Sequence, residues 1–166
     1  MALLPSGLAK TGEVPFPIYP KTIDQSLRID SASSASLIKP AGEKTTATDT
    51  TRCTFSAWIK RGTFTATRTI FIAGTATNNT FIQFVYPDEH IYFRQEVGGS
   101  LVGRVSTSSS FYARDPSAWY HLVVAYDSNE DQSINRVKFW INGVEITDKT
   151  EGGGNAIDSA RANNWF

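Results

Sequence analysis

Paired carboxylates that could catalyse glycoside hydrolysis are the first chemistry to look for in this sequence. Retaining glycosidases hold two carboxylates about 5 to 5.5 Å apart, and side chains on one face of a strand recur at every second residue. A Glu-x-Asp-x-x-Glu run would fit this requirement, and the sequence has none. The nearest carboxylates, Glu145, Asp148 and Glu151, leave a predicted hairpin and enter a Gly-rich stretch. We therefore expect a protein that is not an enzyme.

Metal-ion chemistry has one weak candidate. Asp127, Asn129 and Asp131 place oxygen ligands at a spacing of two residues, as at the start of a Ca²⁺-binding loop. Gln132 stands where that loop needs Gly, and Lys138 stands where it needs Glu. We favour a solvated loop between two strands over a metal site, and we expect no cofactor.

The histidines and the single cysteine give no catalytic pairing that the sequence can justify. His121 falls in a predicted central strand, where a hydrogen-bond partner would hold it, and His90 falls in a predicted turn. Cys53 lies in an apolar run, where a free cysteine behaves as a small hydrophobic core residue. We predict structural roles for all three.

Carbohydrate binding is the remaining site chemistry, because sugars stack on aromatic rings flanked by amide and carboxylate groups. Two predicted loops carry these residue types. The candidate ligand-binding residues are Tyr86, Asp88, Glu89, His90, Phe111, Tyr112 and Arg114. Ordinary packing and subunit contacts use the same residue types, so both interpretations stay open.

The elements that would position these residues are strands. Short runs of alternating apolar residues separated by polar or Gly-containing gaps are typical of strands and turns. The predicted strands are residues 26–29, 36–39, 52–60, 68–73, 79–86, 89–97, 101–107, 119–127, 136–141 and 144–146. The fold class is therefore all-β, an antiparallel sandwich of two sheets.

Turn chemistry predicts how some of these strands connect. Asn142-Gly143 suits a two-residue type I′ hairpin, because both residues tolerate a positive φ. Pro87-Asp88 and Gly98-Gly99 make residues 79–107 a three-strand antiparallel meander. The continuous apolar run of residues 122–125 predicts a central strand covered on both faces.

Period-two alternation predicts which side chains share the interior. In residues 53–60, Phe55, Ala57 and Ile59 fall on one face, whereas Trp58 falls on the other. We expect one core, enclosed between two antiparallel layers. Its marker residues are Phe55, Ile59, Leu122, Val124 and Phe139.

Residues 1–25 differ from the rest because prolines recur among apolar residues, which fits neither a helix nor a central strand. We predict an extended arm that docks on its own domain or on a partner. The predicted docking residues are Leu3, Leu4, Val14, Phe16, Ile18 and Tyr19.

Charge and hydropathy restrict the partners. Sixteen basic residues balance sixteen acidic ones, which gives no reason to expect nucleic acid. The sequence has no apolar run of the ~18 residues that a membrane span needs, so we expect no membrane insertion. The first five residues, with Pro5 and no preceding basic residue, do not read as a secretory signal. We expect a protein made and used without export.

Four blocks of the sequence together resemble a concanavalin A-like (laminin G-like) jelly roll. The blocks are Thr54-Phe55-Ser56-Ala57-Trp58-Ile59-Lys60, Ile70-Phe71-Ile72-Ala73-Gly74, Trp119-Tyr120-His121-Leu122-Val123-Val124-Ala125-Tyr126-Asp127 and Val137-Lys138-Phe139-Trp140-Ile141-Asn142-Gly143-Val144. They occur in the order expected of that family, and the resemblance covers roughly residues 26–148. It implies a sandwich over residues 26–150, between the arm and a Gly-rich segment at 151–166.

Three shorter stretches, residues 24–30, 36–37 and 58–62, are similar to tailed-bacteriophage versions of this domain in fibres and other virion appendages. This resemblance implies a virion structural protein (a tail fibre, head fibre or decoration protein) assembled in the host cytoplasm. Its arm would bind other virion proteins, the sandwich would bind host-surface glycan, and the assembly would be a homo-oligomer, with a trimer favoured. The alternative is a free carbohydrate-binding module or an inactive relative of a glycoside hydrolase.

The resemblance ends after the hairpin, where the family supplies a Gly-containing strand and a closing strand. Residues 151–154 and 156–166 do not supply them. We therefore expect either a fragment of a longer protein or an atypical packing of Ile157, Trp165 and Phe166.

Overall fold

A computed structural model of the chain describes residues 27–29, 36–39, 51–62, 65–75, 77–108 and 113–152. The chain divides into two units, Met1–Pro40 and Ala41–Phe166. The predicted docking residues of the arm and the residues after Gly152 lie outside the described residues. The described part of the chain contains no helix with the length and hydrophobicity of a membrane span.

In the first unit, the predicted strands at 26–29 and 36–39 are wrong. Residues 27–29 and 36–39 have no regular secondary structure. A strand needs a neighbouring backbone to complete its hydrogen-bond ladder, and neither sheet includes these residues. Their apolar character alone is therefore not enough to make them strands.

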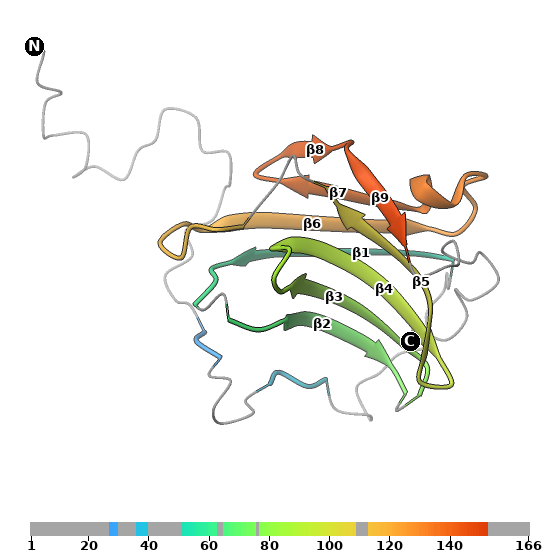
Figure 1. Cartoon of the computed structure of the whole chain (residues 1–166), viewed down its shortest axis with the longest axis horizontal. Helices are drawn as coiled ribbons and strands as arrows, with labels where there is room; N and C mark the ends of the chain where they lie inside the picture. Colours follow the sequence, from blue (N-terminus) through green and yellow to red (C-terminus); the bar gives the residue numbers. More distant parts are fainter. Residues whose placement is uncertain are drawn as a thin grey trace, which may run out of the picture. The chain divides into compact units, whose positions relative to one another are not determined.

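In the second unit, the described residues form two antiparallel sheets that pack face to face (Figure 1). One sheet has the order β1-β6-β7-β8, and the other has the order β2-β3-β4-β5-β9. The bounds are β1 Arg52–Ile59, β2 Arg68–Gly74, β3 Asn79–Val85, β4 His90–Val97, β5 Ser100–Thr107, β6 Tyr120–Asp127, β7 Val137–Ile141, β8 Val144–Ile146 and β9 Lys149–Gly152, with a short 3₁₀ helix at Ser133–Arg136. The predicted all-β jelly-roll sandwich is confirmed.

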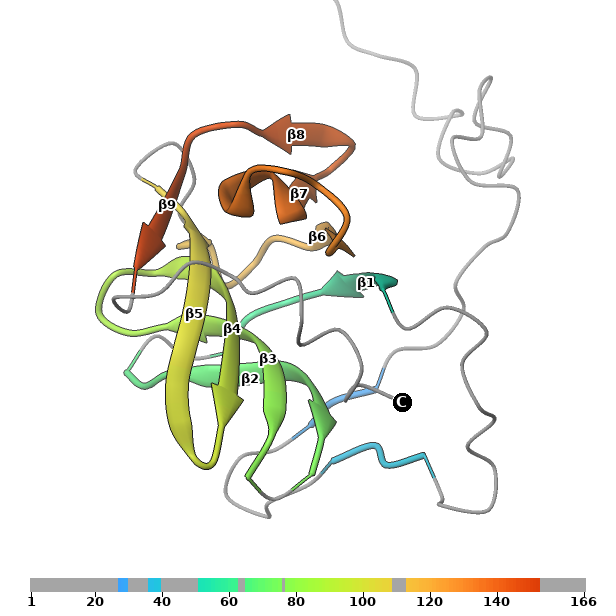
Figure 2. The same ribbon diagram turned by 90° about the vertical axis from the view of Figure 1, so that its right-hand side faces the viewer.

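The core lies between the two layers, which Figure 2 shows nearly edge-on. Leu122, Val124 and Phe139 belong to the buried cluster, and Phe55 and Ile59 pack against it. Period-two alternation therefore identifies the interior correctly. Strand β6 is central as predicted, because it pairs with both β1 and β7. Its predicted burial on both faces is wrong, because buried residues alternate with partly exposed ones from Leu122 onward.

The predicted connections are confirmed. Asn142 and Gly143 have φ values of 51° and 82° in the β7–β8 hairpin, as a type I′ turn requires. The Asn142 side chain adds to this turn, because its Oδ1 accepts a hydrogen bond of 2.8 Å from the backbone N–H of His121. Strands β3, β4 and β5 form the expected meander.

Strand β9 corrects the prediction that residues from Glu151 onward do not continue the fold. Lys149–Gly152 pairs antiparallel with β5, and Gly152 lies opposite Arg104. These residues are polar and do not alternate with apolar ones, so periodicity gives no strand signal. The unpaired edge of β5 supplies the backbone donors and acceptors that make them a strand.

Candidate ligand-binding face

One sheet presents aromatic and polar side chains on its outer face. In β1 and β6 the inward residues pack on the core, so the alternate residues point outward. The pairing register of β1 with β6 and of β6 with β7 then places the outward residues of these three strands side by side. We call this surface the tryptophan face, defined by Arg52, Thr54, Ser56 and Trp58 of β1, His121, Val123, Ala125 and Asp127 of β6, and Lys138 and Trp140 of β7.

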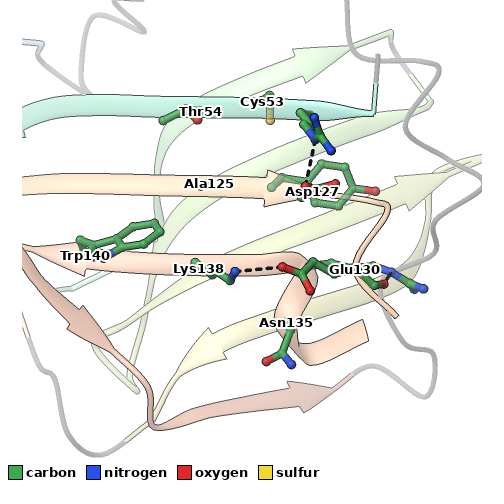
Figure 3. A pocket seen from close by; sticks show the side chains of 11 residues that line it. Cys53, Thr54, Ala125, Asp127, Glu130, Asn135, Lys138 and Trp140 are labelled. Atoms are coloured by element: carbon green, nitrogen blue, oxygen red, sulfur yellow. Dashed lines mark hydrogen bonds and ion pairs between the residues drawn. The ribbon is translucent and has the colours of Figure 1, made fainter. Parts of the chain in front are cut away.

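A pocket of about 530 Å³ opens at one end of the tryptophan face (Figure 3). Thr54, Ala125 and Lys138 form one row of the sheet across it, because Ala125 pairs with both of the other residues. Trp140 also lines the pocket, together with the acidic residues Asp127 and Glu130 and other polar groups. The pocket thus combines an indole ring with hydroxyl, carboxylate and ammonium groups.

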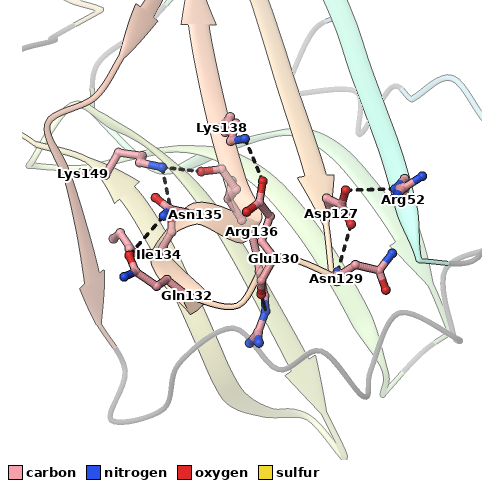
Figure 4. A network of polar contacts seen from close by, with 11 residues as sticks. Arg52, Asp127, Asn129, Glu130, Gln132, Ile134, Asn135, Arg136, Lys138 and Lys149 are labelled. Atoms are coloured by element: carbon pink, nitrogen blue, oxygen red, sulfur yellow. Dashed lines mark hydrogen bonds and ion pairs between the residues drawn. The ribbon is translucent and has the colours of Figure 1, made fainter.

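Ion pairs fix the charged side chains around this pocket (Figure 4). The Nε of Arg52 donates to Oδ2 of Asp127 at 2.9 Å, and Lys138 Nζ donates to Oε1 of Glu130 at 2.9 Å. Oδ1 of Asp127 also accepts from the backbone N–H of Asn129 at 2.9 Å. The Asn129 backbone hydrogen bond, followed by Arg52, lowers the pKa of Asp127. The hydrogen bond with Glu130 raises the pKa of Lys138, so Asp127 and Lys138 are both charged at neutral pH.

The 3₁₀ helix beside the pocket is tied to the sheet edge by a lysine. Lys149 Nζ donates to the backbone oxygens of Ile134 at 2.9 Å and of Val137 at 2.8 Å. Arg136 Nε donates to the backbone oxygen of Glu130 at 2.9 Å. These bonds satisfy carbonyl groups near the end of the helix and hold the loop that carries Glu130 in place.

A second aromatic group lies further along the tryptophan face. The rings of Trp58 and His121 stack with their centroids 5.1 Å apart. Ser56 Oγ lies 3.0 Å from His121 Nε2. His121 therefore has the hydrogen-bond partner that the sequence predicts for it, and Trp58 retains 38% of its surface exposed.

The predicted loop residues lie in different environments. Tyr86 is half-exposed, and Asp88 accepts a hydrogen bond of 2.9 Å from Tyr92 Oη. Glu89 is buried in an ion pair with Arg61. His90 is the first residue of β4 and not a turn residue as predicted, and its Nδ1 is hydrogen-bonded to the backbone oxygen of Thr107. The structure thus gives Glu89 and His90 internal partners and leaves Tyr86 and Asp88 on the surface. Arg114 is exposed, and Phe111 and Tyr112 lie outside the described residues. Ligand binding at these loops stays a prediction.

The other sequence candidates are not brought together as a site. Glu145 is exposed on β8, Asp148 is exposed beyond it, and Glu151 is partly buried on β9. Asp127 and Asn129 bond to each other, and Asp131 is exposed. Among the described residues, no group of three His, Cys, Asp or Glu side chains could hold a metal ion.

Cys53 packs against the core, and this prediction is confirmed. Burial raises the pKa of its thiol to about 11. The thiolate, which is the reactive form, is therefore scarce at neutral pH.

Sequence reasoning missed Trp140 and did not use Trp58 as a site residue. The signal was present for Trp58, because a large aromatic residue on the polar side of an alternating strand must be exposed or covered by a partner. Trp140 lies two strands away from Thr54 across β6. Trp140 and Thr54 come close only because β1 and β7 both pair with β6 in a particular register. The sequence alone does not predict that register.

Comparison with protein families yields one match. The model of the "Concanavalin A-like lectin/glucanases superfamily" matches residues 31–166, and so continues beyond the β7–β8 hairpin. Comparisons with curated proteins and with solved structures give no significant match.

Proposed function

Because the chain belongs to the concanavalin A-like lectin/glucanase superfamily, we propose that it is a non-enzymatic carbohydrate-binding protein that uses the tryptophan face. The fold fits carbohydrate binding in general. Our proposal adds two statements to this general fit: that the ligand binds on the tryptophan face, and that the protein does not hydrolyse it.

The observation that carries this proposal is the pocket beside Trp140. A sugar ring offers an apolar face to an indole and hydroxyl groups to polar side chains. Thr54, Asp127 and Lys138 line the same pocket as Trp140. The ion pairs hold the polar groups in place before a ligand arrives, which reduces the entropy cost of binding.

The electrostatics of the pocket support binding without hydrolysis. A glycosidase needs one carboxyl group with a raised pKa to act as the general acid. Asp127 has a lowered pKa, and Glu130 is paired with Lys138. Asp127 is therefore suited to accept hydrogen bonds from sugar hydroxyls rather than to deliver a proton.

The biological setting that we propose is a bacteriophage virion. The support is the similarity of residues 24–30, 36–37 and 58–62 to virion appendage domains and the apolar, proline-rich composition of residues 1–25. In this proposal the arm docks on other virion proteins in a homo-oligomer, with a trimer favoured. The sandwich then faces host-surface glycan.

Deletion of residues 1–25 tests this setting. We expect the truncated chain to keep its glycan affinity and to lose assembly into particles or oligomers. Unchanged assembly would favour a free carbohydrate-binding module or an inactive relative of a glycoside hydrolase instead.

A glycan array followed by calorimetry tests binding itself. The variant Trp140→Ala should weaken binding of the array ligand about tenfold, equivalent to about 1.4 kcal/mol. The matched control is Val144→Ala, which removes an exposed apolar side chain from β8 that belongs to neither proposed binding surface. Equal affinity of Trp140→Ala and the parent chain would refute the assigned surface. No binding to any glycan on the array would refute glycan binding.

A further inference from the structure

The outer face of the other sheet carries a row of residues from all five of its strands. Register aligns Ile72 with Phe81, Phe81 with Arg94, Arg94 with Arg104, and Arg104 with Gly152. In β4 the residues on either side of Arg94, Phe93 and Gln95, are buried. Arg94 therefore points outward, and its cross-strand neighbours share that face.

Two arginines stand directly opposite each other in this row. We call them the arginine pair, Arg94 and Arg104. Like charges at directly opposed positions on antiparallel strands are destabilising. The ion pair between Glu96 and Arg94 offsets part of this repulsion, and a bound anion would offset the rest.

Aromatic rings hold both guanidinium groups against the sheet. The Arg94 guanidinium carbon lies 5.2 Å from the Phe81 ring centroid, and that of Arg104 lies 5.1 Å from the Tyr92 centroid. Such contacts are favourable cation–π interactions. They also restrict both side chains and so prepare their donors for a ligand.

The backbone of β9 makes room for the second arginine. A Cβ atom on Gly152 would lie 2.5 Å from Nε of Arg104, which is closer than van der Waals contact allows. A residue with a side chain at this position would push Arg104 away from the Tyr92 ring. The absence of a side chain at residue 152 is therefore part of the arrangement.

The donors of the pair exceed the acceptors around them. Arg94 forms an ion pair with Glu96, yet its buried Nε has no hydrogen-bond partner among the described residues. The next carboxylate, Asp88, accepts a hydrogen bond from Tyr92 Oη. Burial and the charge of Arg104 lower the pKa of Arg94, which agrees with a crowded cationic site.

We propose that Arg94 and Arg104 bind an oxyanion, and that this oxyanion is the sulfate or carboxylate group of an acidic glycan. Guanidinium groups match these anions with paired N–H donors in a fixed plane. The oxyanion part rests on the arginine pair alone, whereas the glycan part rests on the proposed function.

Calorimetry on the full chain tests the site with three probes. These are a sulfated, uronate-containing disaccharide, its desulfated and carboxyl-reduced neutral analogue, and inorganic sulfate. We expect the acidic disaccharide to bind at least tenfold more tightly than either of the other probes. Arg104→Gln should abolish this preference, whereas Arg28→Gln, which removes the same charge from an exposed residue that belongs to neither face, should keep it.

Two further variants separate the arginine pair from folding effects. Gly152→Ala keeps both charges but displaces Arg104, so it should weaken binding of the acidic disaccharide severalfold. Gly62→Ala adds a Cβ that meets nothing within 4 Å, so it should leave that binding unchanged. The measured quantity is the preference for the acidic over the neutral disaccharide, so failure of the tryptophan-face proposal would not decide this result.

Three outcomes would overturn the inference. Unchanged acidic-disaccharide binding in Arg104→Gln would refute the arginine pair as the site. An equal loss of the preference in Arg28→Gln would show that binding depends on overall charge and not on the arginine pair. Inorganic sulfate that binds as tightly as the disaccharide would refute recognition of a glycan.

Discussion

At the scale of single residues, the sequence predicts the role of a side chain well where its neighbours along the chain determine that role. It predicts the role poorly where a distant residue determines it. Cys53 in a core environment and His121 with a hydrogen-bond partner both follow from local pattern. Glu89 does not, because its burial depends on Arg61, which lies 28 residues away. Turn composition alone cannot distinguish an exposed glutamate from one that is folded inward onto a distant arginine.

The Arg61–Glu89 pair leads to a stability prediction. Arg61 is 4% exposed and Glu89 is 7% exposed, and Arg61 Nη1 also donates to the backbone oxygen of Ala113 at 3.1 Å. Glu89→Gln leaves a buried cation without its counter-charge, so we expect the free energy of unfolding to fall by about 3 to 5 kcal/mol. Urea denaturation measures this change.

The matched control for this prediction removes both charges. The double variant Arg61→Met, Glu89→Leu should regain much of the lost stability, because no charge is then left buried without a partner. A single Glu89→Gln variant as stable as the parent chain would contradict the proposed role of the pair.

At the scale of elements, period-two alternation predicts eight of the nine described strands, β1 to β8. Strand β9 has no such pattern, and its pairing depends on the free edge of β5. The converse holds for residues 27–29 and 36–39, which are apolar in part but pair with neither sheet. Strand formation at these places is decided by available partners and not by local composition.

The turn between β2 and β3 gives a prediction at this scale. Gly74 has a φ of 130°, and a Cβ there would lie 2.1 Å from the backbone oxygen of Asn78. Gly74→Ala should therefore destabilise the fold by at least about 2 kcal/mol. Gly62→Ala is the control, because a Cβ at Gly62 would meet nothing within 4 Å.

Thermal or urea unfolding distinguishes these two glycine variants. Strong destabilisation by Gly74→Ala with near-parental stability of Gly62→Ala is expected. Equal effects of the two substitutions would show that the β2–β3 turn relaxes freely, contrary to the steric argument.

At the scale of the whole molecule, the predicted sandwich and its interior are confirmed, but the sequence did not identify the tryptophan face. Alternation tells which side of a strand is buried, so one core can be predicted. The tryptophan face depends on lateral order and register, which bring Thr54, Ala125 and Lys138 into one row from distant parts of the chain. The same limit applies to the arginine pair, whose members align only through the β4–β5 register.

The most direct test of the central claim, glycan binding at the tryptophan face, is an NMR titration of the chain with ¹⁵N-labelled tryptophan. The ligand is the glycan identified on the array, and the indole signal of Trp140 is assigned with Trp140→Phe. We predict that this signal shifts progressively and saturates with the dissociation constant measured by calorimetry. A Trp140 signal that stays in place while the glycan binds would contradict the account.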